Sequence, residues 1–125
     1  MGILDGIKIL VVEDEMLVMM NLEVALGDLG CSSICTVASV IKAIALLNEQ
    51  NFDLAILDVN LGGEKSYPIA DILIARGIPF AFSTGYSDHF DRADLNCHLI
   101  LRKPYAARDV ANVVDQLLHP STLPN

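Results

Sequence analysis

The sequence predicts an α/β fold: a doubly wound, parallel sheet of five strands in the order 2-1-3-4-5. Two observations favour this fold. The short runs of apolar residues are nearly continuous rather than alternating, which is typical of strands covered on both faces of a sheet. Longer stretches with helical periodicity separate these runs, so the strands are joined by helices and pair in parallel.

The elements follow one another at regular intervals along the chain. The predicted strands span residues 8–12, 33–37, 54–58, 80–84 and 98–102. The predicted helices span residues 15–29, 39–50, 67–76, 88–94 and 106–119. Glycine, serine and proline mark several boundaries: Gly30 can close the first helix, Ser39 can cap the second, and Pro120 stops the last.

The first helix has more apolar residues than one core-facing stripe requires. Four of them have core spacing: Val18, Leu22, Ala25 and Leu29. Leu17, Met20 and Val24 lie on other faces. This excess marks either a partner surface, with a homodimer as one possibility, or a broad buried stripe, and we favour the buried stripe.

Length and charge limit the function classes. The chain has 125 residues, enough for one domain, which we place at residues 1–119 with a C-terminal tail at 120–125. The net charge of −8 argues against direct binding to nucleic acid or to an anionic membrane surface. No apolar run approaches the roughly 20 residues of a spanning helix, and the N-terminus lacks a signal peptide, so we expect a cytoplasmic protein.

Three carboxylates are predicted to meet at one edge of the sheet. Glu13 and Asp14 directly follow the first strand, and Asp58 ends the third. Because parallel strands finish on the same side, these like charges lie close together and repel unless a cation neutralises them. Mg²⁺ typically takes one or two carboxylates plus phosphate oxygens, so the cluster predicts a magnesium site for phosphoryl chemistry.

The other strands add a hydroxyl and a cation at the same edge. The fourth ends in Ser83-Thr84 and the fifth is followed by Lys103-Pro104. Phosphoryl transfer needs positioning and charge stabilisation more than covalent help. A carboxylate nucleophile (Asp58), a metal held by Asp14 and Asp58, a hydroxyl and an ammonium group would be sufficient.

This set resembles the receiver domain of two-component response regulators, over essentially the whole chain. The matching motifs are V-E-D-E at 12–15, L-D-V-N at 57–60, S-T-G at 83–85 and K-P-Y at 103–105. The segment 79–86, Pro-Phe-Ala-Phe-Ser-Thr-Gly-Tyr, is similar to the FAT GUY subgroup, often found as single domains, with Ser83 where that motif usually has alanine. Ile100 replaces the switch aromatic of the common pattern.

The resemblance implies a flavodoxin-like (βα)5 fold and a role for each matched residue. Asp58 would accept the phosphoryl group, and Glu13, Asp14, Asp58 and the backbone carbonyl of Asn60 would bind Mg²⁺. Thr84 and Lys103 would contact phosphoryl oxygens, and the Lys103-Pro104 bond would be cis.

The resemblance also implies a signalling switch rather than an enzyme acting on other substrates. The chain would catalyse only its own phosphorylation and dephosphorylation. Its partners would be a histidine kinase or histidine phosphotransfer protein, and an output protein that the sequence does not identify.

Two other function classes share parts of this pattern. Aspartyl-phosphate hydrolases also use an aspartate and Mg²⁺, but they usually have a second acid two residues after the nucleophile, where this chain has Asn60. A flavodoxin-like cofactor binder needs a glycine- and hydroxyl-rich loop after the first strand, and the acidic residues there would repel phosphate.

Overall fold

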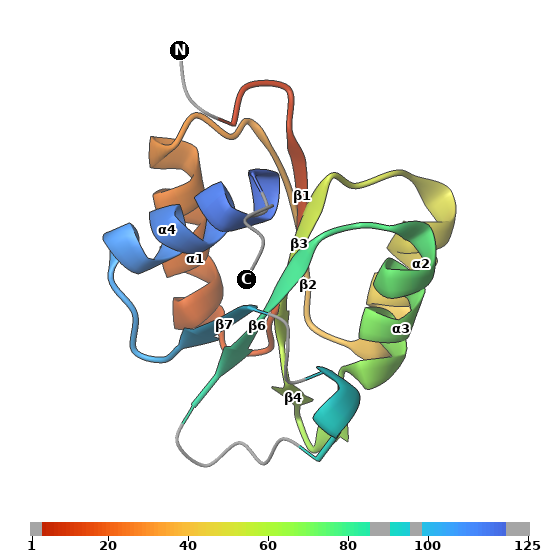
Figure 1. The fold of residues 1–125 in the computed structure, drawn as a ribbon. Helices are drawn as coiled ribbons and strands as arrows, with labels where there is room; N and C mark the ends of the chain where they lie inside the picture. The colour runs from red at the N-terminus through yellow and green to blue at the C-terminus, as the bar shows by residue number, and fades with distance from the viewer. Residues whose placement is uncertain (1–3, 86–90, 96–98, 120–125) are drawn as a thin grey trace, which may run out of the picture.

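The computed structural model describes residues 4–85, 91–95 and 99–119. A central sheet, seen nearly edge-on in Figure 1, separates two helical layers. Helices α1 and α4 cover one face of the sheet, and α2 and α3 cover the other. This is the doubly wound arrangement that the alternating strands and helices predict.

The large sheet has five parallel strands in the order β2-β1-β3-β6-β7, which confirms the predicted order. The strands are β1 (Lys8–Val12), β2 (Ser33–Val37), β3 (Leu54–Asp58), β6 (Phe80–Thr84) and β7 (Leu99–Arg102). They match the predicted ranges, except that residue 98 lies outside the described part of the chain. The order reverses between β1 and β3, so a crevice forms beyond their carboxyl ends.

The four α-helices also lie where the sequence predicts helices. They are α1 (Met16–Asp28), α2 (Val40–Glu49), α3 (Tyr67–Arg76) and α4 (Ala107–Leu118). As predicted, the Ser39 hydroxyl caps α2 by accepting from the Lys42 backbone N–H at 3.2 Å. Gly30, with φ of 95°, turns the chain after α1.

The prediction of a helix over residues 88–94 was wrong where the structure describes that range. Residues 86–90 lie outside the described part, and within 91–95 the one helical element is a 3₁₀ turn, η1 (Ala93–Leu95). Here Arg92 binds Asp94 at 2.7 Å and Asp71 on α3 at 3.1 Å, and its guanidinium lies over the Tyr67 ring. These contacts hold Arg92 and its neighbours against α3, where the sequence had predicted a further helix.

A small antiparallel hairpin after β3 was not predicted from the sequence. Its strands are β4 (Asn60–Leu61) and β5 (Glu64–Lys65). The turn between them is Gly62-Gly63, both with positive φ. Consecutive glycines between two strands are a known hairpin signal, and the two-residue strands were too short to be recognised by periodicity.

The sheet divides the core into two clusters. On one face, Leu57 and Phe82 pack with α2 and α3. On the other, Ile56 and Leu101 pack with α1 and α4. Successive side chains on a strand point to opposite faces, so neighbouring residues of one strand belong to different clusters.

The preferred interpretation of the first helix, a broad buried stripe, was wrong. Leu17, Met20 and Val24 are 76%, 51% and 64% exposed, and neighbouring Met16 is 73% exposed. Leu22, Ala25 and Leu26 alone are buried, because one face of α1 suffices to cover the sheet and contact α4. Within the described residues, no helix is long and apolar enough to cross a membrane.

Candidate functional site

The three predicted carboxylates meet beyond the adjacent strands β1 and β3. Oxygen atoms of Glu13, Asp14 and Asp58 lie within 4.8 Å of one another. Glu13 and Asp58 are buried, with 1% and 2% of their surfaces exposed, whereas Asp14 is exposed. Backbone N–H groups orient the two buried side chains: Glu15 donates to Glu13 Oε2 at 3.1 Å, and Asn60 donates to Asp58 Oδ1 at 3.2 Å.

Lys103 brings a positive charge into the centre of this cluster. Its Nζ lies 3.2 Å from Asp58 Oδ2, 3.2 Å from Glu13 Oε1 and 3.0 Å from Glu15 Oε1. The backbone N–H of Lys103 also donates to the Thr84 carbonyl at 2.7 Å, which fixes the lysine to the end of β6. The Lys103-Pro104 peptide bond is cis, as the resemblance to receiver domains implies.

The pKa values of Glu13, Asp58 and Lys103 are all raised, the two carboxyl groups by burial and the ammonium group by its acidic partners. Burial, and then hydrogen bonding with Asp58, raise the pKa of Glu13 to about 8, although the Glu15 N–H and Lys103 oppose the shift. Burial likewise raises the pKa of Asp58, opposed by Glu13 and Lys103. Burial would lower the pKa of Lys103, but its acidic partners outweigh this and raise it, so the ammonium stays protonated.

The site suits a divalent metal ion with oxygen ligands. Two buried carboxylates and one exposed carboxylate converge, and the one nearby ammonium group carries less charge than they do. A hard cation would relieve that repulsion, and oxygen donors are the ligands that Mg²⁺ prefers. The donor set therefore fits the predicted ion.

The hydroxyl groups at the end of β6 also lie at this edge. Ser83 is the register partner of Asp58 on β3, and Thr84 follows it. Both side chains are buried, and neither hydroxyl has a hydrogen-bond partner among the described residues. A buried hydroxyl without a partner is costly, so Thr84 is available to bond a ligand oxygen.

Three residues of the site had no assigned role in the sequence analysis. Glu15 binds Lys103, and Gly62 and Gly63 line a cavity of about 300 Å³ together with Asp14, Asp58, Asn60 and Lys103. A Cβ added at Gly62 would lie 3.7 Å from Asp14 Oδ2, so the hairpin borders the acidic cluster. Glu15 belongs to the V-E-D-E motif. Its contact with Lys103 was not predicted, because the two residues are 88 positions apart in the sequence.

Comparison with known proteins identifies the family. The family model for the response regulator receiver domain matches residues 9–115. The chain is a response regulator receiver domain. A search of curated proteins found no match.

Solved structures agree with this assignment. This receiver is 44% identical to SdrG from Sphingomonas melonis Fr1, with a TM-score of 0.82 over 90% of this chain and 96% of that one. The BeF3-activated conformation of SdrG from Pseudomonas melonis Fr1 is 45% identical, with a TM-score of 0.76 over 89% and 95% of the two chains. The receiver domain of PhyR from Erythrobacter litoralis shares the fold at 22% identity, with a TM-score of 0.79 over 95% of each chain.

Family membership establishes the general function. Receiver domains are phosphoryl-accepting signalling switches of two-component systems, and they bind Mg²⁺ at acidic residues. This receiver therefore acts in two-component signalling. This chain has an acidic cluster, Glu13, Asp14 and Asp58, at the edge of its sheet.

Proposed function

We propose that Asp58 accepts a phosphoryl group from a phosphohistidine of a histidine kinase or histidine phosphotransfer protein. A carboxylate oxygen of Asp58 attacks phosphorus, a P–O bond forms and the P–N bond breaks. The electron pair leaves with the imidazole nitrogen, which takes up a proton. The observation that carries this proposal is the contact between buried Asp58 and the Lys103 ammonium inside a cluster of carboxylates.

The neighbouring residues would each stabilise this transfer. Asp14, Asp58 and the backbone carbonyl of Asn60 would hold Mg²⁺, with Glu13 acting through water. The ion would neutralise charge on the transferred phosphoryl group. Thr84 would donate to one phosphoryl oxygen and Lys103 would pair with another, exchanging part of its contact with Asp58 for that oxygen.

The receiver would catalyse its own phosphorylation and dephosphorylation and no other reaction. Residues 1–119 would form this switch and 120–125 a tail, and the exchange would take place in the cytoplasm. Phosphorylation would change its binding to an output protein.

We propose that the phosphodonor docks on the exposed apolar face of α1, formed by Met16, Leu17, Met20 and Val24. These residues have helical spacing, so they form one stripe. The stripe begins directly after Glu15, which contacts Lys103 in the site. A homodimer through this face would compete with the donor, and the donor's presence would then shift the oligomeric state.

Mass spectrometry of the intact protein tests the assignment of Asp58. Acetyl phosphate with Mg²⁺ is expected to add one phosphoryl group to the wild type and none to Asp58→Asn. Asp115→Asn, which changes an exposed aspartate on α4, should be labelled like the wild type. Equal labelling of Asp58→Asn, or labelling that persists in EDTA, would refute the proposal.

The same reaction distinguishes a switch from an aspartyl-phosphate hydrolase. A switch accumulates as the phosphorylated protein and releases little phosphate while the donor lasts. A hydrolase would release many equivalents of phosphate from acetyl phosphate with little labelled protein.

A further inference from the structure

Lys103 has three carboxylate partners, and Glu15 differs from the other two. Glu13 and Asp58 are buried and belong, with Asp14, to the cluster of carboxylates that suits a metal ion. Glu15 lies outside that cluster, its side chain is 64% exposed, and its Oε1 atom is 3.0 Å from Lys103 Nζ. An ammonium group has three N–H donors, so these three partners can use all of them.

The backbone of Glu15 is fixed by two hydrogen bonds, so its side chain extends from a defined position. Its N–H donates to Glu13 Oε2 at 3.1 Å, and its carbonyl accepts from the Met19 N–H at 3.0 Å at the start of α1. Lys103 is fixed independently, because its own backbone N–H donates to the Thr84 carbonyl at 2.7 Å. The contact between Glu15 and Lys103 therefore joins the start of α1 to the turn that follows β7.

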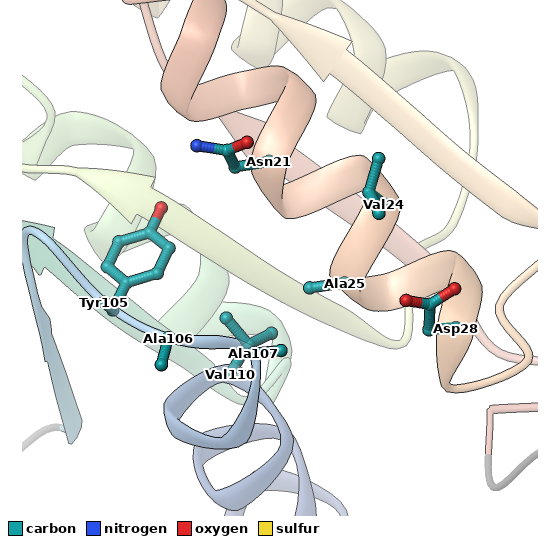
Figure 2. A pocket seen from close by; sticks show the side chains of 8 residues that line it. All are labelled: Asn21, Val24, Ala25, Asp28, Tyr105, Ala106, Ala107 and Val110. Carbon is teal, nitrogen blue, oxygen red and sulfur yellow. The ribbon is translucent and has the colours of Figure 1, made fainter.

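The same contact lies between two cavities. The cavity of about 300 Å³ at the acidic cluster and a second cavity of about 370 Å³ have three lining residues in common: Glu15, Gly85 and Lys103. The second cavity continues towards the groove between α1 and the start of α4 that Figure 2 shows, because Asn21 and Tyr105 line both. Lys103 therefore has open space beside it, into which its flexible side chain can turn away from the acidic cluster.

Mg²⁺ at the acidic cluster would weaken the hold of two of the three partners. The ion would share the negative charges of Glu13 and Asp58, and it would repel the Lys103 ammonium because both are cations. A phosphoryl group on Asp58 would also replace one contact of the lysine. Glu15 lies outside the metal cluster, so its whole charge remains available to Lys103 in each of these states.

We propose that Glu15 is a positioning residue: it holds the Lys103 ammonium at the acidic cluster while Mg²⁺ is bound there, and it keeps the side chain from turning into the second cavity. This inference rests on the proposed function, in which Lys103 pairs with a phosphoryl oxygen on Asp58. Glu15 then affects the rate of phosphoryl transfer through the lysine, without contact with the reacting atoms.

The initial rate of labelling by acetyl phosphate in saturating Mg²⁺ measures this effect, because a small donor does not depend on protein docking. Glu15→Ala is expected to slow labelling about threefold to fivefold, the effect of one exposed ion pair. Glu15→Gln keeps an acceptor oxygen but loses the charge, so its rate should fall between those of Glu15→Ala and the wild type. In a Lys103→Ala background, Glu15→Ala should change the rate less than about twofold, because the group through which it acts is gone.

The chemical reactivity of Lys103 reports its position without any phosphoryl transfer. Reductive methylation of the folded protein, followed by mass spectrometry of its peptides, gives the rate at each lysine. With Mg²⁺, Lys103 of Glu15→Ala should react at least about threefold faster than in the wild type, because the ammonium loses its remaining full partner. In EDTA the two rates should differ less than about twofold, because Glu13 and Asp58 still hold the lysine. Lys42, exposed on α2, is the internal reference.

Glu23→Ala is a matched control, because it removes another exposed glutamate, this one within α1. It should be labelled at the wild-type rate and leave the reactivity of Lys103 unchanged. Slowing equal to that of Glu15→Ala would indicate a general effect of lost charge and would refute the role of Glu15.

The outcomes separate this inference from the proposed function. If the wild type is not labelled, or Asp58→Asn is, the proposed function fails. If the wild type is labelled at Asp58 but Glu15→Ala keeps either the wild-type rate or the wild-type reactivity of Lys103 in Mg²⁺, the role of Glu15 alone is refuted. Full slowing without Lys103, or an equal gain in reactivity with Mg²⁺ and in EDTA, would also refute it.

Discussion

Lys103 contacts Glu13, Glu15 and Asp58 at once, so a single side chain neutralises much of the acidic site. Both oxygens of Glu13 lie near this ammonium, and Oε2 also accepts the Glu15 N–H. Asp14 is exposed at the mouth of the site. Glu13 and Asp14 thus have different environments, although they are neighbours in the sequence.

Asp14→Ala should therefore weaken Mg²⁺ binding more than Glu13→Ala does. We expect a loss of at least about tenfold for Asp14→Ala, because it removes a direct ligand, and about threefold for Glu13→Ala, because Mg²⁺ keeps several waters between itself and distant groups. Calorimetric titration at pH 7 measures both, with Asp115→Ala as a control for lost surface charge. The reverse order would contradict the assignment of direct and water-mediated ligands.

The sequence predicted the identities of these residues better than their contacts. Asp58, Thr84 and Lys103 were recognisable because each lies at the end of an apolar strand. The link from Lys103 to Glu15 arises from the packing of separate elements, 88 positions apart in the chain. Such contacts leave no periodic signal in the sequence.

At the scale of elements, α1 shows why composition alone did not predict burial. Its apolar residues are distributed around the helix, and their spacing does not reveal how many faces of the helix pack against other elements. The sheet and α4 cover only the side that carries Leu22, Ala25 and Leu26. The remaining apolar side chains stay in solvent.

Leu17→Gln and Met20→Gln should therefore leave stability nearly unchanged. We expect the free energy of unfolding to shift by less than about 0.5 kcal/mol, because glutamine is a good helix former and the sites are exposed. Leu22→Ala, at a fully buried site of the same helix, should cost about 2–5 kcal/mol. Urea denaturation measures all three, and a loss above 1 kcal/mol for either glutamine variant would show that this face is covered.

The elements after β3 and β6 were the hardest to predict. The hairpin around Gly62-Gly63 has strands of two residues each, too short for alternation to appear. The turn at 93–95 depends on Arg92 binding Asp71, 21 positions earlier. Both segments are shaped by contacts beyond their own length.

For the whole molecule, the buried carboxyl groups make the metal-free protein sensitive to pH. The pKa of Glu13, about 8 in the folded protein, lies above the usual 4.5, so the folded state holds a proton that the unfolded chain has lost between these values. The stabilising contribution is fully present below pH 4.5 and is lost as the pH rises through 8. Asp58 shifts in the same direction.

In EDTA, the melting temperature should fall as the pH rises from 5.5 to 8.5. We expect Glu13→Gln to reduce this fall by several degrees, corresponding to about 1–2 kcal/mol, because the glutamine does not titrate. Saturating Mg²⁺ should flatten the wild-type profile, since the ion replaces the proton. Scanning calorimetry gives the profiles, and identical slopes for the wild type and Glu13→Gln in EDTA would contradict the expectation.

The overall architecture could be predicted from the sequence because it depends on repeated, local patterns. Continuous apolar strands alternate with helices, and the chemistry-bearing residues stand at strand ends, so strand order alone brings Asp14, Asp58 and Lys103 together. The packing of side chains between layers could not be predicted from the sequence. Those contacts depend on three-dimensional distance.

The sheet that separates the two core clusters also affects how this chain can diverge. Phe82 and its neighbours contact α2 and α3, while Leu101 and its neighbours contact α1 and α4. A change of volume on one side need not be matched by a compensating change on the other, because the two clusters have no side chain in common. The α1–α4 half can therefore change its surface and packing while the α2–α3 half keeps its own, and both continue to support one shared acidic edge.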